Sequence, residues 1–138
     1  MPFPFSDDVV LLSGEDSFYI PIDLADAHRA LYRLLRPEDL ERFRAGSEAN
    51  MVRYHRGLGA WLRHHWGFFR GSRLLTYLQG LGLFHPDDMS GLVLDTFWRS
   101  LHGLPLDVSE HVARAKDYWR AMQKRPAAAH ATEPGSSG

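Results

Sequence analysis

Cysteine is absent from this sequence, which excludes disulfide bonds and thiolate chemistry. Its absence fits a reducing compartment. No apolar run is long enough to span a membrane, and no basic segment is followed by an apolar one of the kind that directs secretion. We therefore expect a cytoplasmic protein that does not insert into a membrane.

Lysine is nearly absent, since Lys116 and Lys124 are the only two in 138 residues. The formal net charge of −1 gives no overall field that would attract nucleic acid or an anionic membrane. Charge is unevenly distributed, however: residues 1–27 contain six acids and no Lys or Arg, whereas residues 49–83 contain five arginines and no acid. We expect the two blocks to pair within the fold. The alternative is a basic patch that faces an acidic partner.

Length and composition suit one globular domain with its own core, because 44% of the residues are hydrophobic. Apolar residues recur at spacings of three and four through residues 23–125. We predict a mainly α fold, a compact single-domain bundle of about six helices. Residues 1–22 are predicted to form a small N-terminal β-hairpin or an extended arm, and residues 126–138, which lack large apolar side chains, a disordered tail.

Local signals predict several helix ends. Asp23 and Ser72 suit N-caps, Pro37 suits the first turn of a short second helix, and Gly82 suits the position after the fourth helix.

The third helix is expected to open at Ser47 or Asn50 and to end at Gly67, with Gly57 and Gly59 in its interior. Interior glycine costs about 1 kcal/mol against alanine, so we attribute it to close approach of another helix.

The last helix has the clearest amphipathic pattern, with apolar residues spaced by four and three: Val108, Val112, Ala115, Trp119 and Met122.

The most site-like string is His85-Pro86-Asp87-Asp88, because a histidine and two carboxylates can bind a divalent metal or share general acid–base work. The simpler interpretation is structural: Asp87 caps the helix that follows, and Asp88 favours its dipole. No second metal-ligand motif accompanies the string, so no metal and no cofactor are predicted.

A second string, Trp66-Gly67-Phe68-Phe69-Arg70-Gly71-Ser72-Arg73, mixes aromatic and basic residues. This mixture is typical of protein-binding hot spots and of single-stranded nucleic-acid sites, where Trp61, Trp66 and Arg70 would stack and bind phosphate. It is equally typical of a buried aromatic corner, with Arg70 or Arg73 paired to Asp87 or Asp88. The scarcity of lysine argues against nucleic acid.

The middle of the chain thus carries two long motifs, Trp66-Gly67-Phe68-Phe69-x-Gly71-Ser72-x-Leu74 and His85-Pro86-Asp87-Asp88-Met89-Ser90, followed by Trp98-Arg99. These strings resemble an uncharacterised bacterial family, a domain of unknown function, over about residues 24–120. The family pattern often has Leu-Trp where this chain has Phe68-Phe69, so an indole-specific role is not expected there. The resemblance implies no activity, but it implies a role as an immunity protein of polymorphic toxins.

The leading hypothesis is therefore an immunity-type binding protein that neutralises a partner toxin by occlusion, without chemistry of its own. The alternative is a small enzyme of unknown reaction with a His-Asp-Asp and arginine polar centre. The partner is expected to be a protein, and the sequence leaves the oligomeric state open. The candidate binding residues are Arg63, Trp66, Phe69, Arg70, Arg73, His85, Asp87 and Asp88.

Overall fold

The computed structural model of the chain describes residues 19–124. Within this range the protein is mainly helical and contains no β-strand. Its elements are α1 (Leu24–Leu34), α2 (Pro37–Ala45), the 3₁₀ turn η2 (Glu48–Asn50), α3 (Met51–Arg56), α4 (Leu58–His65), α5 (Arg73–Leu81), α6 (Pro86–Leu101) and α7 (Val108–Lys124). Residues 1–18 of the predicted hairpin or arm and the predicted tail at residues 126–138 lie outside the described residues, and residues 19–22 form no strand.

Several predicted helix ends are confirmed. The Asp23 side chain accepts a hydrogen bond from the Asp26 N–H at the start of α1, and Ser72 accepts one from the Leu75 N–H at the start of α5. α2 begins at Pro37. Gly82 ends α5 in the left-handed conformation, with φ of 110°, which a residue without Cβ adopts readily.

The predicted third helix is wrong in one respect, because the structure divides it at Gly57 into α3 and α4. Gly57 has φ of −90° and ψ of −79°, outside the usual helical range, and glycine accepts this distortion at low cost. A Cβ at Gly59 would lie 3.6 Å from Ser90 Oγ on α6, which is an ordinary van der Waals separation, so the approach of α6 does not by itself require glycine there.

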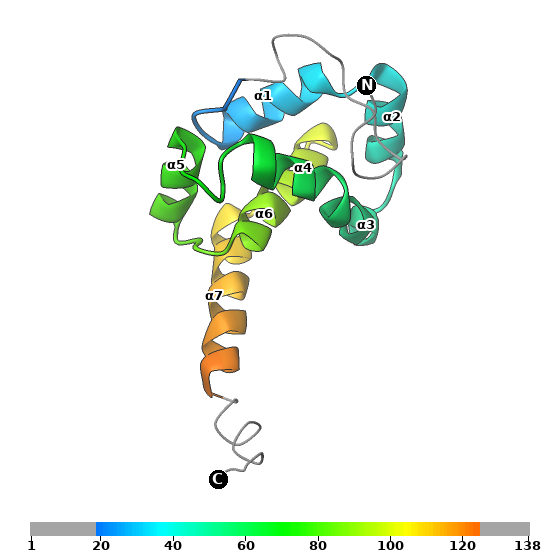
Figure 1. The fold of residues 1–138 in the computed structure, drawn as a ribbon. Helices are drawn as coiled ribbons and strands as arrows, with labels where there is room; N and C mark the ends of the chain where they lie inside the picture. The colour runs from blue at the N-terminus through cyan, green and yellow to red at the C-terminus, as the bar shows by residue number, and fades with distance from the viewer. Residues whose placement is uncertain (1–18, 125–138) are drawn as a thin grey trace.

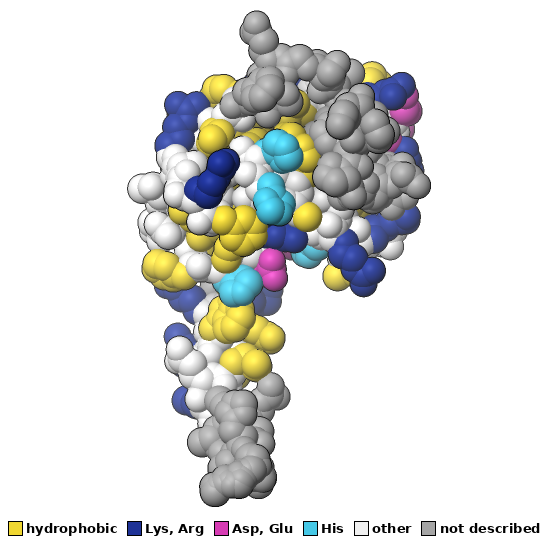
Figure 2. Space-filling view, viewed as in Figure 1, with side chains coloured by type: hydrophobic (Ala, Val, Ile, Leu, Met, Phe, Trp, Pro, Cys, Tyr) yellow, Lys and Arg dark blue, Asp and Glu magenta, His cyan; other side chains and the backbone are white. Residues whose placement is uncertain are grey.

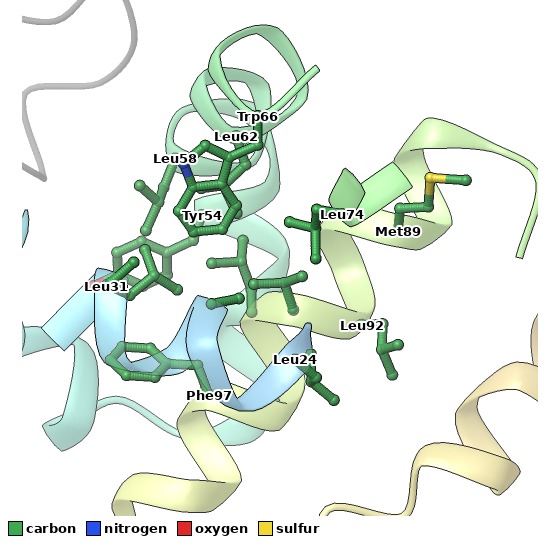
Figure 3. Close-up of a cluster of buried hydrophobic side chains, with 14 of the residues drawn as sticks. Leu24, Leu31, Tyr54, Leu58, Leu62, Trp66, Leu74, Met89, Leu92 and Phe97 are labelled. Atoms are coloured by element: carbon green, nitrogen blue, oxygen red, sulfur yellow. The ribbon is translucent and has the colours of Figure 1, made fainter. Parts of the chain in front are cut away.

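α6 is the central helix of the body and packs against α1, α2, α3, α4 and α7 (Figure 1). Every residue from Met89 to Leu94 is buried, so this helix is enclosed on all sides over that stretch. Side chains of α1, α3, α4, α5 and α6 converge on one shared core around Trp66 and Phe97 (Figure 3). The apolar stripes predicted for α3 to α6 thus reach a common interior.

α7 departs from the predicted compact bundle. Its first half lies against α6, and its remainder extends away from the helical body (Figure 1). Val112 is its one buried residue within the described range, and Trp119 is 38% exposed. Val108 and Ala115 are partly buried against the core, so the first half of the α7 stripe is covered and Trp119 in the second half is partly exposed.

Candidate functional site

α6 begins at the string His85-Pro86-Asp87-Asp88, and its N-cap is His85. The predicted cap, Asp87, is wrong: His85 Nδ1 accepts a hydrogen bond from the Asp87 N–H at 3.1 Å. Pro86 takes the first helical position, where its fixed φ suits the helix and its missing N–H has no partner to lose. Asp87 and Asp88 consequently fall in the first turn, where their charges favour the helix dipole.

Arg63 reaches this point from α4. Its Nη1 donates to Ser90 Oγ at 2.8 Å, and its Nε lies 3.4 Å from Asp87 Oδ1. The Asp87 side chain is 69% exposed, so this ion pair stabilises the fold by about 1 kcal/mol or less. A Cβ at Gly59 would lie 3.2 Å from Arg63 Nη1, so the guanidinium would have to shift by a few tenths of an ångström to admit a side chain there.

Trp119 of α7 completes the arrangement. Its ring stacks on the His85 imidazole, with centroids 4.8 Å apart and planes at 17°, and its Nε1 donates to Asp88 Oδ2 at 2.7 Å. We call the five residues Arg63, His85, Asp87, Asp88 and Trp119 the α6 corner. Trp119 was predicted only as part of an apolar stripe. The available signal was its indole N–H, which needs an acceptor when the ring packs against protein.

The aromatic residues of the second string divide between core and surface. Trp66 is fully buried, and Ser72 Oγ donates to its carbonyl oxygen at 2.7 Å. The prediction that Trp66 contributes to a binding surface is therefore wrong. Trp61 is only 2% exposed, so neither indole can stack on a nucleic-acid base. Phe69 is 60% exposed and lies against His64, with ring centroids 5.4 Å apart.

The expected pairing of Arg70 or Arg73 with Asp87 or Asp88 is also wrong. Arg70 is exposed and forms no hydrogen bond or ion pair within residues 19–124. Arg73 Nε donates to the Ile20 carbonyl at 2.8 Å, and its guanidinium lies over the Tyr19 ring at 5.2 Å. These contacts hold residues 19–20 against the start of α5, so Arg63 is the arginine that meets the acidic string.

The hydrogen bonds of the α6 corner limit its chemistry. A neutral His85 whose Nδ1 accepts an N–H carries its proton on Nε2, so the remaining nitrogen cannot act as a base. Asp88 accepts from Trp119, and Asp87 faces Arg63. One acceptor atom of each of these three residues is therefore engaged within the corner, and this geometry does not by itself favour the enzyme hypothesis.

A groove borders the α6 corner, between residues 82–88 and α7. It has a volume of about 470 Å³ and is lined by Phe84, Trp119, Lys116 and Arg120, among others. Phe84 is 73% exposed. Space-filling shows hydrophobic side chains gathered where α7 leaves the body, beside a histidine and an acidic side chain (Figure 2). The groove is thus apolar at its centre and basic on its α7 side.

A second polar cluster joins α3, α6 and α7 over Gly91. His55 Nε2 lies 3.9 Å from Asp95 Oδ1, and His111 Nδ1 lies 3.6 Å from Asp95 Oδ2. Burial lowers the pKa of His111, although the Asp95 carboxylate opposes that shift. Sequence reasoning missed this cluster, because its members lie on three helices at no recognisable spacing. Its separations are ion-pair rather than hydrogen-bond distances.

Residues 19–124 contain neither a metal-binding cluster nor a membrane-spanning helix. No group of three or more metal-ligating side chains is placed there to hold a metal ion. No helix in this range is both long enough and apolar enough to cross a membrane.

Comparison with known proteins identifies a family but no characterised relative. No curated protein and no solved structure matches the chain. A family model described as "Domain of unknown function (DUF6794)" matches residues 20–101, from the segment before α1 to the end of α6. This span ends before α7, whereas the expected resemblance extended to about residue 120. Since the match covers more than half of the 138 residues, the chain belongs to the DUF6794 family.

Proposed function

We propose that this protein is a cytoplasmic immunity-type binding protein, which neutralises a partner bacterial toxin by occluding it and carries out no chemistry of its own. The observation that carries the binding part is the set of exposed aromatic residues at and next to the α6 corner. Phe84 is 73% exposed, Tyr118 56% and Trp119 38%. Aromatic side chains left in water around a rigid corner are typical of protein-binding hot spots.

The rigidity of the corner supports occlusion. His85, Asp88 and Trp119 hold one another by stacking and a hydrogen bond, so the surface is preformed. A preformed surface loses little conformational entropy on binding. The immunity role itself rests on a resemblance. The Trp66–Leu74 and His85–Ser90 strings resemble the uncharacterised bacterial family named in the sequence analysis, and that resemblance implies an immunity protein of polymorphic toxins.

The test is co-expression with toxic open reading frames encoded beside this gene. We expect survival of the host with one of them, and isolation of a stable complex of the two proteins. Occlusion predicts protection in proportion to the amount of this protein, reaching completion near equimolar expression.

Two outcomes would contradict the proposal. One is the absence of both protection and a complex with every neighbouring toxic protein. The other is full protection at strongly substoichiometric amounts, because one molecule would then inactivate many toxin molecules, as a catalyst does. The Tyr32→Ala variant is a control for the loss of an exposed aromatic ring elsewhere on the protein. Tyr32 is 59% exposed, similar to Tyr118, and lies on α1, far from α7 (Figure 1), so this variant should protect as the wild type does.

A further inference from the structure

The apolar stripe of α7 has the spacing of a helix-packing seam. Val108, Val112, Ala115, Trp119 and Met122 are separated by alternating steps of four and three residues. This narrow repeat is the one by which two helices pack along their length. Val108, Val112 and Ala115 pack against the core of the body, whereas Ala115 and Trp119 also line the groove beside Phe84.

The charge around the exposed part of the seam is one-sided. Lys116 and Arg120 line the groove, and Lys116 forms no hydrogen bond or ion pair with a described residue. The one acid that lines the groove, Asp88, already accepts the Trp119 N–H. Arg120 pairs with Asp117, but both side chains are mostly exposed, so a closer partner can replace that contact.

We infer that the groove between residues 82–88 and α7 is the docking site for an amphipathic helix of the partner protein, with acidic residues flanking that helix's apolar face. This inference rests on the proposed function and names the chemistry of the partner. Apolar side chains of the incoming helix pack between Phe84 and Trp119. Its flanking carboxylates face Lys116 and Arg120.

A second copy of this chain fits the groove less well than such a partner. A second copy would bring its own Lys116 and Arg120 and so would not supply the carboxylates that the basic side of the groove lacks. The family match ends at Leu101, so the seam lies in the part of the chain that the family model does not describe.

The probe is a pair of fluorescein-labelled helical peptides with leucine at the seam positions. One has glutamate at all flanking positions and the other has lysine there. With the full chain at low salt, we expect the glutamate peptide to bind roughly tenfold more tightly, measured by fluorescence anisotropy, and the difference to shrink as salt is added. Lys116→Glu should remove or reverse this preference.

The Phe84→Ala variant should weaken both peptides, whereas the matched Tyr32→Ala variant should bind as the wild type does. Phe84 and Tyr32 are both exposed, so neither change removes a core side chain. Equal affinity for the two peptides, or binding of neither, would overturn the inference. A concentration-dependent dimer abolished by Phe84→Ala would overturn it too, in favour of a second copy.

The failure of this inference can be told apart from that of the proposed function. If the toxin is neutralised equally well by the wild type, Phe84→Ala and Lys116→Glu, the docking site is wrong and the immunity role stands. If the glutamate peptide binds as expected and no neighbouring toxin is neutralised, the docking site stands and the immunity role is wrong.

Discussion

Two glycines of the connector between α4 and α5 show how the environment of a single residue decides its tolerance. Gly67 and Gly71 both have positive φ, 77° and 117°. A Cβ at Gly67 would lie 2.7 Å from the Gly71 carbonyl oxygen, whereas a Cβ at Gly71 would meet no atom within 4 Å. At both positions a residue other than glycine would adopt a strained backbone conformation. Only at Gly67 would its Cβ also collide with a backbone atom.

We therefore predict that Gly67→Ala destabilises the protein more than Gly71→Ala. The conformational cost of positive φ is about 1–2 kcal/mol for both, and the collision at Gly67 adds roughly 1–3 kcal/mol. Urea unfolding of the two variants measures the difference. Equal losses of unfolding free energy would show that the connector relaxes around the new methyl group.

His28 is the histidine whose environment most alters its proton affinity. Its Nε2 lies 2.8 Å from Thr96 Oγ1. The Thr96 hydroxyl donates to the Leu92 carbonyl at 2.6 Å, so His28 must be the donor to Thr96. Burial lowers the pKa of His28 to about 4. The unfolded chain, with a histidine pKa near 6.5, therefore binds this proton when the folded protein does not.

Stability should consequently fall as pH drops from about 6.5 to about 4, because protonation favours the unfolded state in that window. We expect a loss of about 1–3 kcal/mol across it from His28 alone, and no further loss from this group below pH 4. Comparing the pH dependence of unfolding in the wild type and in His28→Gln isolates this contribution, since glutamine can still donate to Thr96. Parallel pH profiles would rule it out.

At the scale of elements, the helix ends hold the connector in place. Ser72 Oγ accepts the Leu75 N–H at 3.1 Å and donates to the Trp66 carbonyl at 2.7 Å, so one side chain caps α5 and ties it to the end of α4. Trp98 ties α6 to the end of α2, because its Nε1 donates to the Gly46 carbonyl at 2.9 Å. The neighbouring Arg99 binds Glu48 in η2. These motif residues therefore serve the fold.

Replacing Ser72 by alanine should cost about 1–2 kcal/mol, because α5 loses its cap and the Trp66 carbonyl loses its donor. Ser109→Ala is the matched control, since Ser109 is exposed in the first turn of α7 and should change unfolding free energy by less than about 0.5 kcal/mol. Thermal unfolding of both variants provides the measurement. A Ser72→Ala protein as stable as the control would contradict the capping role.

At the scale of the whole molecule, the protein consists of a helical body centred on α6 and one helix that extends from it. The body encloses the buried stretch Met89–Leu94, whereas α7 has one buried residue of 17. Trp119 and His111 attach α7 to α6 through Asp88 and Asp95. The second half of α7 therefore contributes little to the core of the body.

Amide hydrogen exchange should therefore differ strongly between the two helices. No residue of α7 after Trp119 is buried, so we expect residues 120–124 to exchange at least about a hundredfold faster than residues 89–98 of α6. A partner that binds the groove should slow exchange in α7 selectively. Equal protection of both helices in the isolated protein would show that α7 is already covered in solution.

The sequence by itself determined the helical class and most helix ends, because caps, prolines and glycines act over a few residues. Asp23, Pro37, Ser72 and Gly82 stand where local chemistry predicts. Local reasoning failed at Gly57, where the helix breaks, and at Asp87, whose place as cap belongs to His85. His85 satisfied the capping rule that had been assigned to Asp87, and Gly57 distorts a helix that the apolar pattern on either side continues, so the backbone geometry decided both.

Only the tertiary structure decided which polar and aromatic residues share a site. It buried Trp66, turned Arg73 toward Ile20, and brought Trp119 to His85 and Asp88 across 31 or more residues of sequence. The α7 stripe was visible in the sequence, but its exposure was not. Periodicity reports that a helix has an apolar face, whereas the surface that covers that face depends on how much core the other helices have already closed.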